Sequence, residues 1–158
     1  MKSLLRFLQI FALGTWVGSI LFFSFVIAPG LFGILASRDE AGAVVGYSLD
    51  RLHSWGAVAA VIYLIAAIWV GKSLKALVRP AAIGVVLMLL LTVCSAHIVI
   101  PRMDALRLKM PSLEATPSSD PQRAEFDRLH GISVGLEASV LLIGVAAIFL
   151  TVRQNDKE

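Results

Sequence analysis

Four long apolar stretches separate the charged residues of this chain, and three of them contain no charge at all. Residues 7–37, 54–71 and 80–100 contain no charged side chain, and residues 131–152 contain only Glu137. A helix of about 20 apolar residues is long enough to cross the ~30 Å hydrocarbon core of a bilayer. The pattern predicts an all-α integral membrane protein, a four-transmembrane-helix bundle that forms a single domain over residues 1–158. Its predicted spans are about 7–29, 54–71, 80–100 and 131–152.

Two of the four helices are predicted to continue beyond the membrane as helical extensions on its outer face. The sequence Ser37–Glu40 has the form of a capping box, in which the serine and glutamate side chains bond free first-turn amides. A helix from there to about Gly71 is roughly 50 Å long at 1.5 Å per residue. Pro121 in a first turn after Ser119 predicts a similar start for a helix that runs to about Arg153. Pro29 is expected to end or kink the first helix.

Composition favours a membrane protein over a soluble one. Hydrophobic residues make up 58% of the chain, and its mean hydropathy is +0.83, which leaves too little polar surface for a soluble domain of this size. The first apolar stretch is longer than the ~7–15 apolar residues of a signal peptide, so we expect a retained helix. The predicted partner is therefore the lipid bilayer. The net charge of +3 does not indicate nucleic-acid binding.

The link over residues 72–79 decides the predicted orientation. It contains Lys72, Lys75 and Arg79 and no acidic residue, whereas the other two links mix basic with acidic residues. Basic links remain on the cytoplasmic side of a membrane. Both termini and this link are therefore predicted to be cytoplasmic, in a multi-pass protein of the cell's inner (cytoplasmic) membrane.

All three histidines lie toward the same end of their apolar stretches. His53 precedes the second stretch, His97 lies three residues before the end of the third, and His130 precedes the fourth. Imidazole is a common metal and haem ligand, and Cys94 lies about one turn from His97 on the same helix face. These residues are candidates for a site that holds copper, zinc or haem b near the outer leaflet. Taken singly, His53 and His130 also fit interfacial anchors, and Cys94 fits a small core residue.

Glu137 is the one charged residue inside a predicted span. A carboxylate in hydrocarbon is costly and indicates a functional site. The alternative is a structural hydrogen bond to a neighbouring helix, with Ser95, Tyr63 or Trp16 as its partner. His97 also lies inside an apolar stretch, so we expect it to face inward and to share one polar site with His130.

Charged and small residues give two further expectations about packing. Asp50, Arg102 and Asp127 lie at the outer ends of the spans and are expected to form a salt-bridged collar. Two GxxxG sequences, one in the first span and one in the fourth, predict that these two helices pack closely. Their glycines are Gly14 and Gly18, and Gly131 and Gly135.

Four short segments resemble the transmembrane protein 205-like family. They are Trp16–Gly18, Phe22–Phe25, Pro101–Arg102 and Phe126–Ser133, and together they extend from the first span to the fourth. That family is largely a domain of unknown function found in bacteria and eukaryotes. The general architecture is also similar to copper-resistance D-type and HemJ-type membrane proteins, which are helical bundles that carry histidines. This second resemblance concerns the fold alone.

Three functional hypotheses follow. The first is a non-enzymatic protein that binds or moves a transition-metal ion, or holds a haem. The second is a membrane oxidoreductase that uses this haem, and the third is a structural or assembly factor that docks a membrane partner or a second copy of itself. The single cysteine excludes an intrachain disulfide and CxxC redox chemistry. Phosphate-binding loops, HExxH and nucleophile-elbow sequences are absent from the sequence.

The orientation can be tested by cysteine-accessibility labelling. With cysteine introduced at position 73 or 118, we expect Ser73→Cys to be labelled from the cytoplasmic side and Ser118→Cys from the opposite side, because residues 72–79 carry three basic residues and no acid. The reverse labelling would overturn the orientation and leave the four spans unchanged.

Overall fold

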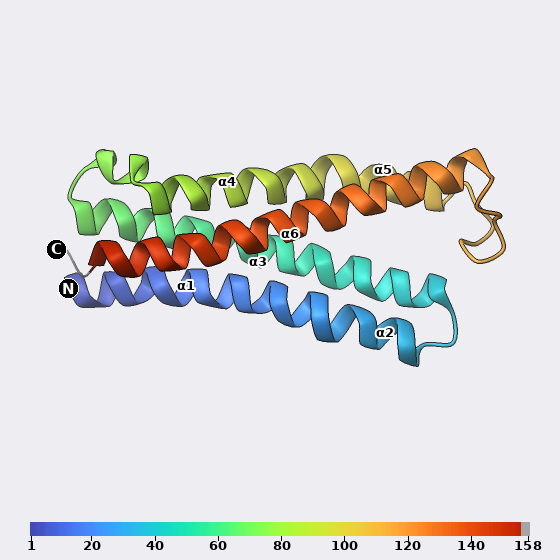
Figure 1. The fold of residues 1–158 in the computed structure, drawn as a ribbon, viewed down its shortest axis with the longest axis horizontal. Coiled ribbons are helices and arrows are strands. Elements are labelled where there is room, and N and C mark those ends of the chain that lie inside the picture. Colours follow the sequence, from blue (N-terminus) through green and yellow to red (C-terminus); the bar gives the residue numbers. More distant parts are fainter. Residues whose placement is uncertain (156–158) are drawn as a thin grey trace.

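The computed structural model describes residues 1–155 as a bundle of long helices (Figure 1). The first span consists of α1 (Lys2–Phe22), a π-helical turn η1 (Phe23–Ile27) and α2 (Ala28–Ile34). The second is α3 (Arg38–Gly71), which a 3₁₀ turn η2 (Leu74–Val78) connects to the third. The third span consists of α4 (Pro80–Cys94), a π-helical turn η3 (Ser95–Val99) and α5 (Ile100–Arg107). The fourth is α6 (Pro121–Asn155).

The four spans are each long and apolar enough to cross a membrane, which confirms the predicted four-helix membrane bundle. The start of α1, the end of α6 and the link with η2 lie at one end of the bundle, here called the terminus end (Figure 1). The link between α2 and α3 and the long link over residues 108–120 lie at the other, here called the loop end.

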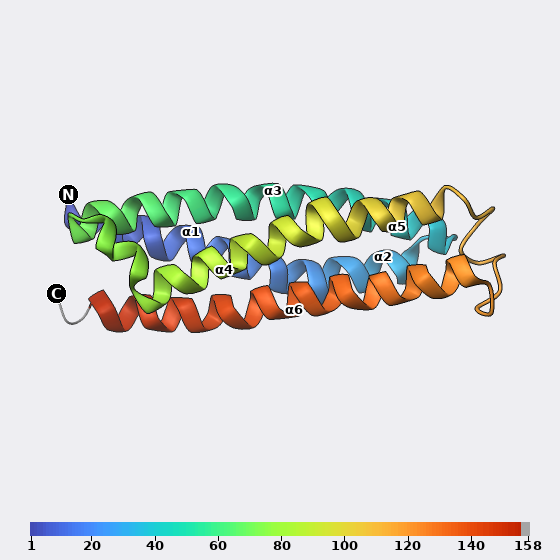
Figure 2. The same ribbon diagram turned by 90° about the horizontal axis from the view of Figure 1, so that it is seen from above.

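Each span packs against two of the others, so the bundle has two diagonals. α1 packs against α3 and α6, and α4 packs against the same two helices. The two views of the ribbon agree: α3 and α6 lie on opposite corners, and α1 lies opposite α4 (Figures 1 and 2). A contact between α3 and α6 must therefore cross the axis of the bundle.

Pro29 does not end the first helix. The helix continues to Ile34, and the π-helical turn η1 lies directly before this proline. Pro101 in the third span has the same arrangement, with η3 before it. Proline lacks an N–H group and its ring clashes with the carbonyl four residues earlier. The wider π turn accommodates that clash inside a continuous span.

Side chains cap the two long helices at the loop end. The Ser37 hydroxyl accepts hydrogen bonds from the amides of Asp39 (3.1 Å) and Glu40 (3.4 Å), as the capping sequence predicted. At the start of α6 the cap is Asp120, whose carboxylate accepts from the amides of Gln122 (2.7 Å) and Arg123 (3.2 Å). Both long helices therefore begin with an ordered turn at this end.

The link over residues 108–120 is held against the start of α3. The amide of Leu113 donates to the Asp39 carboxylate (3.1 Å), and the amide of Arg38 donates to the Glu114 carboxylate (3.0 Å). The Arg123 guanidinium donates to the Leu113 carbonyl. These contacts join the second, third and fourth spans at the loop end.

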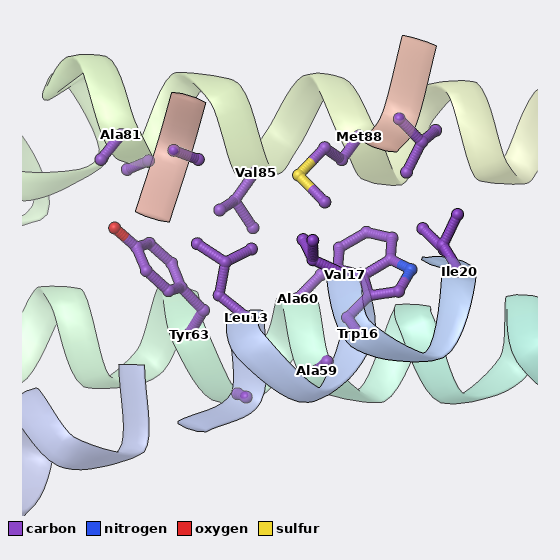
Figure 3. Packing of buried hydrophobic residues seen from close by; sticks show 14 of the residues in the cluster. Leu13, Trp16, Val17, Ile20, Ala59, Ala60, Tyr63, Ala81, Val85 and Met88 are labelled. Carbon is purple, nitrogen blue, oxygen red and sulfur yellow. The ribbon is translucent and has the colours of Figure 1, made fainter. Parts of the chain in front are cut away.

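The core is built from a few large side chains set against many small ones (Figure 3). Trp16 and Val17 of α1 point into the bundle, and Met88 of α4 points toward them. Two glycines permit the close approach. A Cβ at Gly56 would overlap the Trp16 ring, and a Cβ at Gly144 would lie 2.5 Å from Val17 Cγ2 and 2.9 Å from Met88 Cε.

The glycines of the two GxxxG sequences do not make the predicted contact. A Cβ built at Gly14, Gly18, Gly131 or Gly135 meets no atom within 4 Å. α1 does pack against α6, but the close approach is at Gly144. The prediction named the wrong glycines. A GxxxG sequence places two glycines on one face of a helix, but it does not determine which neighbour that face points toward.

Gly56→Ala is expected to lower the thermal midpoint of the purified protein. The added methyl must displace the buried indole of Trp16, and overpacking of this kind costs about 1–3 kcal/mol. Gly135→Ala is the matched control, since its Cβ meets open space and alanine favours a helix over glycine. Equal midpoints for the two variants would contradict the contact.

Candidate functional site

A histidine and a glutamate meet across the axis of the bundle. His53 of α3 is 5% exposed, and its Nε2 lies 3.1 Å from Oε2 of Glu137 on α6. The Glu137 side chain is 13% exposed. Because α3 and α6 lie on opposite corners, this contact joins two helices that do not pack as neighbours.

The pattern of α3 explains why His53 points inward. His53, Gly56, Ala60, Tyr63 and Ala67 recur at spacings of three and four residues, and all are buried. This spacing places them on one face of a helix. Three of these five positions are glycine or alanine, and Gly56 leaves room for the Trp16 indole that lies over it.

Contacts at Gly144 fix the level of Glu137 in the bundle. Gly144, Val17 and Met88 lie together, so they mark one level on three helices. Glu137 and Ser95 each lie seven residues from that level, about 10 Å toward the loop end. Ser95 is 1% exposed and belongs to η3. The π turn therefore places a buried hydroxyl at the height of the carboxylate.

Two polar atoms near this level have no hydrogen-bond partner among the described residues. They are Nδ1 of His53 and Oγ of Ser95, and both are buried. Buried polar atoms in native proteins nearly always have a partner, and an orphan calls for a physical explanation. The site therefore has hydrogen-bonding capacity beyond the His53–Glu137 contact.

A second polar contact crosses the same diagonal nearer the terminus end. The Tyr63 hydroxyl lies 2.8 Å from Thr151 Oγ1, and Thr151 donates to the Ala147 carbonyl (2.7 Å). Tyr63 is thus the donor to Thr151. Beside it is a polar cavity of about 10 Å³, room for about one water molecule, with Gln9 and Gln154 in its wall.

Neither the Tyr63–Thr151 contact nor the partner of Glu137 was predicted from the sequence. Of the three partners considered for Glu137, the structure uses none, and His53 takes that place. A signal was present: Thr151 lies fourteen residues after Glu137, which is two heptads and the same face of α6.

The other two histidines lie outside the core, so the predicted shared site is not formed. His97 in η3 and His130 in α6 are both exposed, and the His130 ring stacks on Phe126 at 6.5 Å between centroids. Cys94 is half-buried. Within residues 1–155, no three His, Cys, Asp or Glu side chains are grouped so that they could hold a metal ion. The expectation that His97 faces inward failed because π-helical geometry in η3 turns Ser95 to the core in its place.

The salt-bridged collar predicted from Asp50, Arg102 and Asp127 is not seen among these three residues. Asp127 pairs with Arg123 one turn away on α6 (3.0 Å), while Asp50 and Arg102 are exposed, and no ion pair joins either to Asp127 within the part of the chain that the structure describes. Arg107 is the arginine that joins helices here: its guanidinium lies against Gly42 of α3 and 5.8 Å from the Phe126 ring of α6.

Residues 11–112 match a protein family described as a domain of unknown function (DUF4149). The chain belongs to this family. An uncharacterized protein of Aquifex aeolicus (strain VF5) is similar to it, with 29% identity over 131 residues, which are 83% of this chain and 84% of that protein. No solved structure matches. The family match includes His53 and Ser95 and does not reach Glu137, so the chemistry of the site must be argued from its geometry.

Tyr63→Phe is expected to lower the free energy of unfolding by about 1 kcal/mol, because it leaves Thr151 Oγ1 without its donor in a buried place. The measurement is the thermal midpoint in detergent. Tyr47→Phe removes the same atom from a side chain that is 64% exposed, and it should leave the midpoint unchanged. An equal loss in both variants would show that the cross-axis contact contributes nothing.

Proposed function

We propose that this DUF4149 protein is a non-enzymatic, proton-binding membrane protein. The His53–Glu137 pair takes up and releases a proton, and the state of the pair alters how α3 and α6 are held across the bundle axis. The observation that carries the proposal is the 3.1 Å contact between Nε2 of His53 and Oε2 of Glu137 inside an apolar bundle.

Both members of the pair are able to exchange protons. Imidazole is the side chain that ordinarily titrates near neutral pH, and ionisable groups inside a membrane mark proton pathways and ligand sites. The unpartnered Nδ1 of His53 gives the ring a second position at which a proton, or a water that carries it, can bind. Ser95 Oγ supplies another such position at the same level.

Packing favours proton exchange with the loop end. Toward the terminus end, the pair is followed by a layer of buried apolar side chains that includes Trp16, Val17 and Met88. Toward the loop end, α3 carries exposed Asp50 and Arg51 within one turn of His53. The path from the pair to water is therefore short on one side and closed by the core on the other.

Few other charges face the pair. α1 presents Trp16 near His53, and η3 presents Ser95; neither titrates near neutral pH. The nearest charged residues along α3 are Asp50 and Arg51, and both are exposed. The response of the site to pH is therefore the response of His53 and Glu137 to each other.

Stability alone does not require such a pair. Replacing a buried ion pair by apolar side chains of similar volume is often neutral or stabilising, whereas removing one partner costs about 3–5 kcal/mol. Leucine at both positions is therefore expected to leave the bundle folded. The retention of two ionisable groups supports a functional role.

Thermal midpoints of the full chain in lipid nanodiscs at about pH 8 and about pH 5 test the proposal. Imidazole ordinarily takes up a proton between these two pH values, and an imidazolium beside a carboxylate forms an ion pair that a neutral ring does not form. We expect the midpoint to differ by at least about 3 °C between the two pH values, since 1 kcal/mol corresponds to about 2–4 °C for a chain of this size.

The double variant His53→Leu, Glu137→Leu should fold and lose this pH dependence, while the exposed controls His97→Gln and His130→Gln should keep it. A wild-type midpoint that is the same at both pH values would contradict the proposal. A double variant that melts far below wild type would assign the pair a structural role.

Three finer predictions from the sequence stay proposals. They are the inner-membrane location with cytoplasmic termini, the resemblance to the transmembrane protein 205-like family, and association with a second copy or a membrane partner. The last has one supporting observation: the GxxxG glycines of α1 and α6 have open space where a Cβ would lie, so another helix has room to approach there. Copper, zinc and haem b have no support in the arrangement of the histidines, and neither does the oxidoreductase that would use such a haem.

A further inference from the structure

An open groove lies at the terminus end, at the corner where α3 leads into η2. Its walls are formed by Ile68, Trp69, Lys72, Ser73 and Leu74, and its volume is about 430 Å³. That volume is within the range of sites that hold small molecules, about 300–1,000 Å³. The groove lies at the end of α3 and is separate from the His53–Glu137 site, which lies near the middle of that helix.

The apolar walls of the groove face away from the bundle. Trp69 is 64% exposed and Leu74 is 71% exposed. Trp69 lies at the end of the uncharged stretch 54–71 and Leu74 lies three residues beyond it, where the hydrocarbon gives way to the headgroup region. Tryptophan is enriched at this level of membrane proteins because its ring is apolar and its N–H is polar.

The rim of the groove is positively charged. Lys72 is exposed and has left-handed backbone geometry (φ 49°), which ends α3 and turns the chain into the link. Glycine is the usual residue at such a turn, because a side chain there is strained. Lys75 and Arg79 follow in the same link, and residues 72–79 contain no acid.

We propose that this groove binds an anionic phospholipid. The acyl chain lies against Ile68, Trp69 and Leu74, and the headgroup phosphate binds the Lys72 ammonium. Along the bilayer normal, an anionic lipid has apolar chains followed by a negative headgroup. The groove has an apolar wall followed by a positive rim in the same order, so the two are complementary. Basic residues next to a membrane span attract anionic lipid headgroups.

Quenching of Trp69 fluorescence by brominated lipids tests the proposal. The full chain carries Trp55→Phe, so that Trp69 is the exposed reporter and Trp16 remains buried in the core. Brominated phosphatidylglycerol is expected to reach half-quenching at about one fifth of the concentration that brominated phosphatidylcholine requires. A second chain with Trp69→Phe reports on Trp55 and should show no preference between the two lipids.

The variants Lys72→Gln and Lys75→Gln distinguish a groove from a diffuse charged surface. Lys72→Gln should remove the preference for the anionic lipid, and Lys75→Gln, which changes a lysine outside the groove, should preserve most of it. Equal quenching by the two lipids, or equal effects of the two variants, would overturn the proposal. Loss of the preference on addition of inorganic phosphate would assign Lys72 to a free anion and also overturn it.

Discussion

Close approach between helices at two glycines sets the geometry of this bundle. Lipid chains are as apolar as leucine, so burial of apolar surface does not drive helices together inside a bilayer, and packing contacts must do so. Trp16 fits over Gly56, and Val17 and Met88 meet at Gly144. Alanines such as Ala59, Ala60, Ala81 and Ala82 continue the same small surface. The levels at which polar side chains meet all follow from these contacts.

Two polar contacts cross the diagonal that the apolar packing leaves open. Tyr63–Thr151 and His53–Glu137 both join α3 to α6, and the members on α6 lie fourteen residues, or about 21 Å, apart. The first is a neutral hydrogen bond with its donor and acceptor satisfied. The second combines two ionisable groups and leaves Nδ1 of His53 without a partner. The unpartnered ring nitrogen and the two ionisable groups are the reason why the proposed function belongs to His53–Glu137 and not to Tyr63–Thr151.

The two ends of the bundle meet water in different ways. At the loop end, capped helices and the docked link of residues 108–120 build an ordered polar structure with both signs of charge. At the terminus end, a short link carries Lys72, Lys75 and Arg79 beside exposed Trp69 and Leu74. The first arrangement suits an aqueous surface, and the second suits contact with lipid headgroups.

The sequence by itself determined the four spans, the capped start of α3 at Ser37 and the unbroken length of α3 and α6. Each depends on local properties: the length of an uncharged stretch, the bonding of first-turn amides, and the 1.5 Å rise per residue. It also identified Glu137 as the costly residue within a span. The tertiary structure alone decided which side chain meets Glu137, because partners on different helices depend on the rotation and level of each helix. A π turn sets the direction of His97, and the contacts at Gly56 and Gly144 set the rotation of the helices that carry the GxxxG glycines. Spacing along a single helix reveals neither the turn nor these contacts.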